Sequence, residues 1–432
     1  MSRHYDMVSW SEEEIHAFTE NDESRPLPTS KRVTRTEKIF LHFTEELSYY
    51  CHLSKNLYNQ ATYLIKQGLD NSGTWLRYKT LWDQLKDSPN YKNLPAQTAQ
   101  QTLRKVDQNW NAFFRANKDY KEHPEKYLGP PRPPRYKPTN GEFQLIFTNQ
   151  QVRIRKGMFK LPRKLNLEVQ TRLSRHIPLR GARILPRGTG YLLEILYSKE
   201  VPEPEPTQER IAAINIGVTN LVTMANNIGV DPIVVKGGII KAINQWFNKE
   251  LSRLQSIYGQ QGRKSGAKLR TLQRKRDAQI NDYFHKTSRE TINECIDLMI
   301  DTLVIGYNPL WKQNVNIGKR NNQNFVNIPF HKLIQQLQYK AEEIGINVII
   351  IEEGYTSKCS FLDLEPIKEH QKYQGKRVKR GLYRSKNGML LNADVNSAYN
   401  ILRKVVPNAF AEGIADVGLH PICVPIWTSD YM

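Results

Sequence analysis

The stretch RIAAINIGVTNLVTMA, residues 210–225, constrains the fold of this 432-residue chain more than any other segment. Two apolar runs flank a Gly-Val turn, a pattern typical of two adjoining strands in a buried sheet. The run DPIVVKG that follows indicates a third strand, antiparallel to its neighbour. One polar residue, Asn215, interrupts the first apolar run and is therefore the first candidate for chemistry.

The segments after this hairpin alternate between helix and strand. The apolar spacing predicts helices over 241–258 and 265–300, a strand over 301–307, a helix over 330–345, a strand within 347–355 and a last helix with Asp394 near its start. This order predicts an α/β core with a mixed sheet, which is the order of the ribonuclease H-like fold.

The first half of the chain follows a different pattern. It predicts a strand over 36–45, helices from 46 to about 127, and short strands with Gly/Pro turns over 142–200. The expected result is a small antiparallel barrel that carries an inserted helical bundle. The polar, locally acidic residues 1–35 are expected to form a flexible extension, and the proline-rich stretch 201–209 marks a boundary.

The charge of the chain favours a nucleic-acid partner. Lys and Arg number 63 against 43 Asp and Glu, a formal charge of +20, and the basic residues are clustered. A generally cationic, solvated surface is the open alternative. The four cysteines lie too far apart for a zinc ribbon, and no stretch approaches the ~18 apolar residues of a membrane span. We therefore expect no zinc, no membrane partner, and a cytoplasmic, nucleoid-associated location in a bacterium.

Three positions are candidates for a site that cleaves phosphodiesters. Two-metal cleavage needs several carboxylates close together, and magnesium prefers oxygen ligands. Asn215 lies in the predicted first strand, Glu353 follows an apolar strand, and Asp394 stands near a helix start. The structural alternatives are ordinary, since Asp394 at a helix start interacts favourably with the helix dipole and a strand-end Glu is often solvated.

Several motifs in the second half resemble one known family. They are INIGVTNL (214–221), LVIGYNPLWKQ (303–313), IPFHKLIQQLQYKAEEIGI (328–346), EEGYTSKCSFLD (352–363) and RVKRGLYRSKNGMLLNADVNSAYNILRKVV (377–406). Together they resemble the TnpB proteins, transposon-encoded RNA-guided DNA nucleases with a RuvC-like core that are related to compact type V CRISPR effectors. The resemblance covers about the last half of the chain.

The resemblance implies a fold of class α/β plus all-β, with a ribonuclease H-like (RuvC) nuclease domain preceded by a small β-barrel domain with an inserted helical bundle. The expected divisions are a flexible acidic extension over 1–35, a wedge-like β-barrel over 36–45 and 128–205, a helical recognition insertion over 46–127, a RuvC-like domain over 206–358 and 391–432, and a target-nucleic-acid-binding insertion without a zinc ribbon over 359–390.

The resemblance also implies the roles of the candidate residues. Asn215 stands where the family has its first catalytic Asp, and Gly306 stands where many members have their catalytic Glu. A subgroup carries that Glu shortly before the TSK motif, where this chain has Glu353. With Asp394, these make the expected catalytic set Asn215, Glu353 and Asp394. Glu353 and Asp394 are the expected ligands of Mg²⁺ or Mn²⁺, whose binding Asn215 weakens.

The remaining candidates are basic or aromatic residues expected to contact nucleic acid. They are Arg263, Lys264, Lys268, Arg270, Arg274, Lys275, Arg276, Trp311, Lys312, Lys358, Arg377, Lys379, Arg380 and Arg384. A solvated helix face, or a packing role for Trp311, is the alternative for members of this set.

These expectations lead to one function and three alternatives. The leading hypothesis is an RNA-guided DNA-binding protein, one monomer per guide RNA, that binds a complementary DNA duplex with a short flanking motif and cuts it poorly or not at all. The alternatives are an active metal-dependent endonuclease in which Asn215 supports a metal, a structural RNA-binding protein, and a transposase that acts by covalent tyrosine chemistry.

Overall fold

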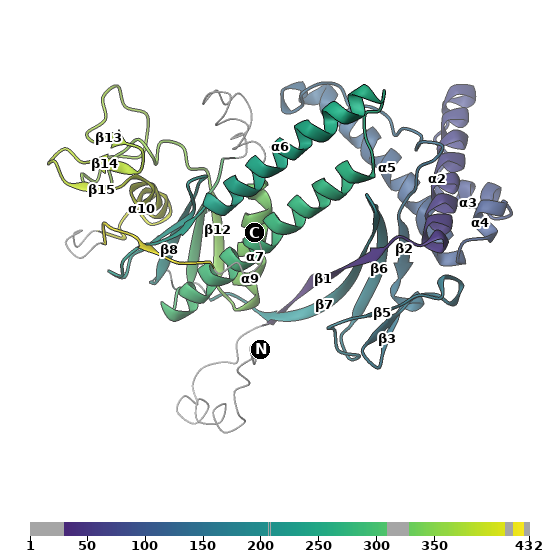
Figure 1. Ribbon diagram of the computed structural model, residues 1–432, viewed down its shortest axis with the longest axis horizontal. Helices are drawn as coiled ribbons and strands as arrows, with labels where there is room; N and C mark the ends of the chain where they lie inside the picture. Colours follow the sequence, from purple (N-terminus) through teal and green to yellow (C-terminus); the bar gives the residue numbers. More distant parts are fainter. Residues whose placement is uncertain (1–29, 206, 208, 309–327, 411–417, 427–432) are drawn as a thin grey trace.

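A computed structural model describes residues 30–205, 207, 209–308, 328–410 and 418–426 of the chain (Figure 1). A helical bundle lies at one end of the molecule, and α10 (Ala393–Val405) with the small sheet β13–β15 (residues 376–392) lies at the other; the six-stranded sheet, the long helices and the curved antiparallel sheet lie between them. Among the described residues, no helix is both long and apolar enough to cross a membrane.

The helical bundle contains α2 (Glu45–Ser72), α3 (Tyr78–Leu85), α4 (Pro89–Lys92) and α5 (Ala96–Glu122). The Thr44 hydroxyl accepts the Leu47 N–H at 3.2 Å and caps the N-terminus of α2, whose first turn is acidic. Gly73, with φ at 64°, ends this helix in the left-handed conformation that glycine adopts at no steric cost. The apolar faces of α2 and α5 pack together in one core.

The curved sheet is antiparallel, with strand order β1–β7–β6–β2. Its strands are β1 (Ser30–His42), β7 (Gly190–Pro202), β6 (Leu179–Arg187) and β2 (Leu145–Thr148). A second, three-stranded sheet contains β3 (Arg153–Arg155), β4 (Met158–Lys160) and β5 (Glu168–Gln170). In chain order, the four helices of the bundle lie between β1 and β2.

Two expectations for this region need correction. Residues 30–35 belong to β1, which pairs with β7 over its whole length, so this part of the expected flexible extension is a strand. Within the described residues, β1 and β2 are the two edges of an open sheet, so the strands do not close into the expected barrel. Residues 1–29 lie outside the described residues.

The six-stranded sheet is mixed, as the sequence predicts, with strand order β12–β11–β8–β9–β10–β16. Its strands are β8 (Ile211–Ile216), β9 (Asn220–Asn226), β10 (Ile233–Lys236), β11 (Thr302–Gly306), β12 (Asn347–Ile351) and β16 (Ile422–Cys423). β8, β9 and β10 are antiparallel neighbours, whereas β11 runs parallel to both β8 and β12.

Helices cover both faces of this sheet. The helices are α6 (Gly238–Gln260), α7 (Ala267–Asp297), α9 (Phe330–Glu343) and α10 (Ala393–Val405). Side chains alternate along a strand, so Ala212 and Ile214 of β8 share a core with α7 and α9, while Ile211 and Ala213 share a second core with α10. By the same alternation Asn215 belongs to the α10 face, at the carboxyl end of β8.

Helices α7 and α9 connect this sheet to the curved one. Arg274 of α7 lies over the Phe40 ring of β1, with the guanidinium carbon 4.5 Å from the ring centroid. Arg35 of β1 donates to Glu342 of α9 at 2.7 Å, and Lys199 of β7 forms an ion pair with Glu343. These contacts fix the position of the curved sheet relative to the helices that cover the six-stranded sheet.

The insertion after the TSK motif contains β13 (Lys376–Lys379), β14 (Leu382–Arg384) and β15 (Leu390–Asn392), which form a small antiparallel sheet. A buried carboxylate organises its first loop, because Glu365 accepts the N–H groups of Ser360 at 2.7 Å and Gln374 at 2.9 Å. The Cys359 thiol is also buried, 3.4 Å from the Pro366 carbonyl oxygen, and burial raises its pKa.

Candidate functional site

Asn215 and Gly306 are neighbours at the carboxyl ends of two parallel strands. The register of β8 and β11 pairs Ile214 with Ile305, which places the next residues, Asn215 and Gly306, side by side. Polar side chains at this edge of a parallel pair project into a shared space beyond the sheet. The two positions that depart from the family pattern are therefore adjacent in space.

Glu353 reaches the same place from the next strand. It follows β12, whose last residue, Ile351, pairs with Gly306. A Cβ atom at Gly306 would lie 3.3 Å from the Glu353 Oε2 atom and only 2.4 Å from the Ile401 Cδ1 atom. The strand end therefore has no room for a side chain at 306, and the carboxylate from 353 lies against it. That Glu353 serves in place of a glutamate on β11 stays a prediction.

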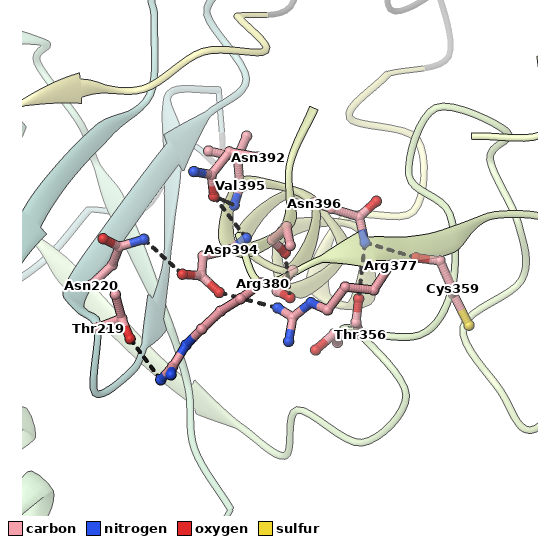
Figure 2. A network of polar contacts seen from close by, with 12 residues as sticks. Thr219, Asn220, Thr356, Cys359, Arg377, Arg380, Asn392, Asp394, Val395 and Asn396 are labelled. Atoms are coloured by element: carbon pink, nitrogen blue, oxygen red, sulfur yellow. Dashed lines mark hydrogen bonds and ion pairs between the residues drawn. The ribbon is translucent and has the colours of Figure 1, made fainter. Parts of the chain in front are cut away.

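Asp394 comes to this face on the first turn of α10. The Asn392 side chain caps the helix and accepts the Asp394 N–H at 2.9 Å. Asp394 Oδ2 accepts a hydrogen bond from Asn220 Nδ2 at 2.7 Å, and Oδ1 lies 3.4 Å from Arg377 Nη2 (Figure 2). Asn220 in turn accepts from Lys236 Nζ at 3.2 Å. Both carboxylate oxygens of Asp394 are thus engaged by protein donors.

The two asparagines that follow Asp394 hold the TSK turn. Asn396 and Asn400 are fully buried one helical turn apart, and each donates to the Cys359 carbonyl oxygen, at 2.9 and 2.8 Å. Asn400 also donates to the Thr356 carbonyl oxygen at 3.0 Å. The Thr356 hydroxyl donates to the Glu353 carbonyl oxygen at 2.8 Å. This chain of bonds ties α10 to the loop that carries Glu353.

The donor set at this site does not fit a centre that holds two divalent ions. The described residues contain no group of three or more His, Cys, Asp or Glu side chains arranged to hold a metal ion. Asn215 adds an amide oxygen without charge, and Arg377 places a positive charge beside Asp394. Divalent ions of this class are bound best by anionic oxygen ligands. The site has two carboxylates where the family pattern has three.

Most of the expected nucleic-acid contacts are exposed. Arg263 and Lys264 lie between α6 and α7, and Lys268, Arg270, Arg274 and Lys275 are exposed on α7. The side chains of the second group, Lys358, Arg377, Lys379, Arg380 and Arg384, are exposed in and beside the insertion. Trp311 and Lys312 lie outside the described residues.

Arg276 is a correction to this set. It is buried, donates to Asn244 Oδ1 of α6 at 2.8 Å, and lies over the Phe247 ring. Burial lowers the pKa of its guanidinium. Arg276 therefore joins α7 to α6 and does not belong to the exposed basic face, because the helix surface at this position turns towards its neighbour.

The sequence reasoning missed the residues that arrange the site around Asp394. Asn220 belongs to the INIGVTNL motif, but nothing in that motif predicts its contact with Asp394, and Lys236 and Lys241 stand in no motif. The pairing of β8, β9 and β10 brings Asn220 and Lys236 to Asp394, and the start of α6 brings Lys241 to Thr219.

Comparisons with known proteins agree with these observations. The family described as a probable transposase, OrfB_IS605, matches residues 194–311, and the Cas12f1-like TNB domain family matches residues 330–401. A TnpB-like protein of Acidianus two-tailed virus is 25% identical over 220 residues, 48% of this chain and 44% of that protein. The chain thus spans less than half the length of this curated relative.

Two solved structures also match much of the chain, both at low sequence identity. A cryo-EM structure of a Cas12f1–sgRNA–target DNA complex is 17% identical with a TM-score of 0.34, over 85% of this chain and 98% of that one. A structure of the mini-RNA-guided endonuclease CRISPR-Cas phi3 is 9% identical with a TM-score of 0.47, over 87% and 92% of the two chains.

Proposed function

We propose that this chain, which belongs to the TnpB family, is an RNA-guided DNA-binding protein with an impaired ability to cut. The feature that supports impairment is the neutral amide of Asn215, which stands at the end of β8 beside Gly306, where the Glu353 carboxylate also lies. Loss of one charged ligand removes several kcal/mol from metal binding and from stabilisation of the transition state. The frame of the site is otherwise intact.

The proposed partners are a guide RNA and a complementary DNA duplex with a short flanking motif. In proteins of this type, base pairing reads the sequence while the protein holds phosphates through Lys and Arg. The formal charge of +20 and the exposed cations on α7 and on the β13–β14 hairpin support this proposal. We propose one monomer per guide RNA and a place of action at the bacterial nucleoid.

The proposed metal is Mg²⁺ or Mn²⁺, bound weakly. Glu353 and Asp394 are the residues that would hold it, and a bound ion would polarise a phosphodiester. Arg377 opposes such binding, because it already neutralises part of the charge on Asp394.

An active endonuclease is the second candidate. Glu353 and Asp394 are both present, and the loop and helix that carry them are tied together through Asn400 and Thr356. In this alternative the Asn215 amide oxygen completes a working site.

One assay on the full chain, copurified with its own RNA, separates these functions. The complex is given Mg²⁺ and either a guide-matched duplex or a duplex with an unrelated sequence, and binding and cleavage are scored separately. We expect tight binding of the matched duplex alone, with little cleavage. Cleavage at a rate typical of an active nuclease would support the second candidate. Equal affinity for both duplexes would indicate a structural RNA-binding protein instead.

A further inference from the structure

Two cationic side chains converge on one hydroxyl beside the candidate site. Arg380, in the turn between β13 and β14, donates to the Thr219 hydroxyl at 2.9 Å (Figure 2). Lys241, in the first turn of α6, donates to the same oxygen at 3.0 Å. Thr219 lies in the turn between β8 and β9, so three separate segments meet here.

The described part of the chain places no carboxylate in an ion pair with either of these charges. A hydroxyl is neutral, and among the ion pairs formed by the described residues none joins a carboxylate to Arg380 or Lys241. Burial, and then the nearby charge of Arg380, lower the pKa of Lys241. The positive charges of Lys241 and Arg380, which contact the same hydroxyl, repel each other, and an anion bound by both would offset this repulsion.

The surface at the start of α6, next to Lys241, is open. Gly238, the first residue of α6, is exposed, and a Cβ atom at this position would meet nothing within 4 Å. No side chain caps the N-terminus of α6, so free backbone N–H groups and the positive end of the helix dipole lie close to Lys241. The ion pair between Arg377 and Asp394 holds the β13–β14 hairpin over this turn.

We propose that Thr219, Lys241 and Arg380 form a binding site for a phosphodiester group of a nucleic-acid strand, and that this site needs no divalent metal. Guanidinium and ammonium donors make short, charge-assisted hydrogen bonds to phosphate oxygens, and the hydroxyl adds a neutral donor. This proposal rests on the proposed function in one respect, because it requires a nucleic-acid strand to pass over the six-stranded sheet. The contact would hold that strand beside Asp394 without any contribution from the carboxylates.

The test measures binding of a labelled single-stranded DNA oligonucleotide to the full chain in EDTA, over a range of salt concentrations. The double variant Arg380→Gln/Lys241→Gln is compared with the unmodified chain. We expect the double variant to bind about tenfold more weakly and to show a salt slope smaller by about 0.7, the value for one lost phosphate contact. An RNA oligonucleotide of the same sequence shows which type of strand the site prefers.

The matched control is Arg253→Gln. Arg253 is an exposed arginine of the same helix, α6, and is already paired with Glu250 at 3.0 Å. It should leave both affinity and slope unchanged. Two further variants separate loss of charge from misfolding. Arg380→Lys keeps the positive charge and should keep most of the affinity, whereas Thr219→Val keeps the side-chain shape, removes the hydroxyl and should lose part of the affinity.

Equal affinity and slope for the unmodified chain and the double variant would overturn the proposal. So would a difference that is seen only when Mg²⁺ is added. Because the assay uses no guide-matched duplex, its failure leaves the proposed guided binding untouched. Conversely, if the chain fails to bind a guide-matched duplex, the proposed function fails, but a salt slope that differs between the two chains in the oligonucleotide assay still supports the phosphate site.

Discussion

At the scale of single residues, the proposed function depends on Asn215, which has nearly the shape of an aspartate but lacks its negative charge. Asn215 and aspartate have nearly the same volume, so the pairing of β8 with β9 and β11 does not depend on which is present. The difference is electrostatic. An asparagine at 215 offers a divalent cation no charge, so a cation gains less from binding beside it than beside an aspartate.

Gly306 gives the first prediction at this scale. Substitution Gly306→Ala places a methyl group 2.4 Å from the Ile401 Cδ1 atom and 3.3 Å from the Glu353 Oε2 atom. We expect the free energy of unfolding, measured by urea denaturation, to fall by about 1–3 kcal/mol because the core of α10 is overpacked. The control is Gly129→Ala, where the added atom meets nothing within 4 Å. Equal stability of both variants would show that 306 tolerates a side chain.

Asn396 and Asn400 give the second prediction. Their buried amides satisfy the carbonyl groups of Thr356 and Cys359. We expect each alanine substitution to lower the free energy of unfolding by about 1–3 kcal/mol, because buried carbonyl groups lose a donor. Gln371→Ala, at an exposed amide of the same insertion, should change it by less than about 0.5 kcal/mol. A loss no larger than that of Gln371→Ala would contradict the role assigned to the pair.

At the scale of elements, α7 and α9 are joined by a buried charge. Lys340 of α9 donates to the His285 carbonyl oxygen and to the Ser288 hydroxyl of α7, both at 2.7 Å. Burial, and then the charge of Arg289, lower the pKa of Lys340 to about 8. Its charged form is therefore disfavoured in the folded chain, which makes this contact between the helices sensitive to pH.

Lys340 supplies the third prediction. Between pH 8 and the ordinary lysine pKa of 10.5, the unfolded chain binds more protons at this residue than the folded chain does. The free energy of unfolding of the unmodified chain should therefore rise relative to Lys340→Met, by up to about 1.4 kcal/mol per pH unit. Below pH 8 the difference between the two chains should be constant. Urea denaturation at about pH 7 and about pH 9.5 measures it, and an equal difference at both would contradict the shift.

The elements themselves follow from local pattern, whereas the contacts between distant segments do not. The apolar spacing predicts α6, α7, α9 and α10 to within a few residues, and the apolar runs predict β8, β11 and β12. The polar residues 30–35 carry no strong strand signal and become a strand because β7 pairs with them. Arg276 looks like its basic neighbours in sequence but turns towards α6. Tertiary packing, which no local pattern encodes, decides both cases.

At the scale of the whole molecule, the candidate site is assembled from three distant parts of the chain. Asn215 comes from the central strand β8, Glu353 from the loop after β12 and Asp394 from the start of α10. The sheet register brings the first two together, and Asn220 connects β9 to the third. Under the proposed function, the charge missing at Asn215 is what impairs cleavage, and we expect its restoration to restore cleavage.

The measurement that tests this claim most directly is the single-turnover cleavage rate of guide-matched DNA by the unmodified chain and by Asn215→Asp, each with Mg²⁺ and with its copurified RNA. The account predicts equal binding and a rate at least about 10²-fold higher for Asn215→Asp. The variant Asn215→Asp/Asp394→Asn should lose that gain, which ties the activity to this site. Equal rates for the unmodified chain and Asn215→Asp would contradict the account.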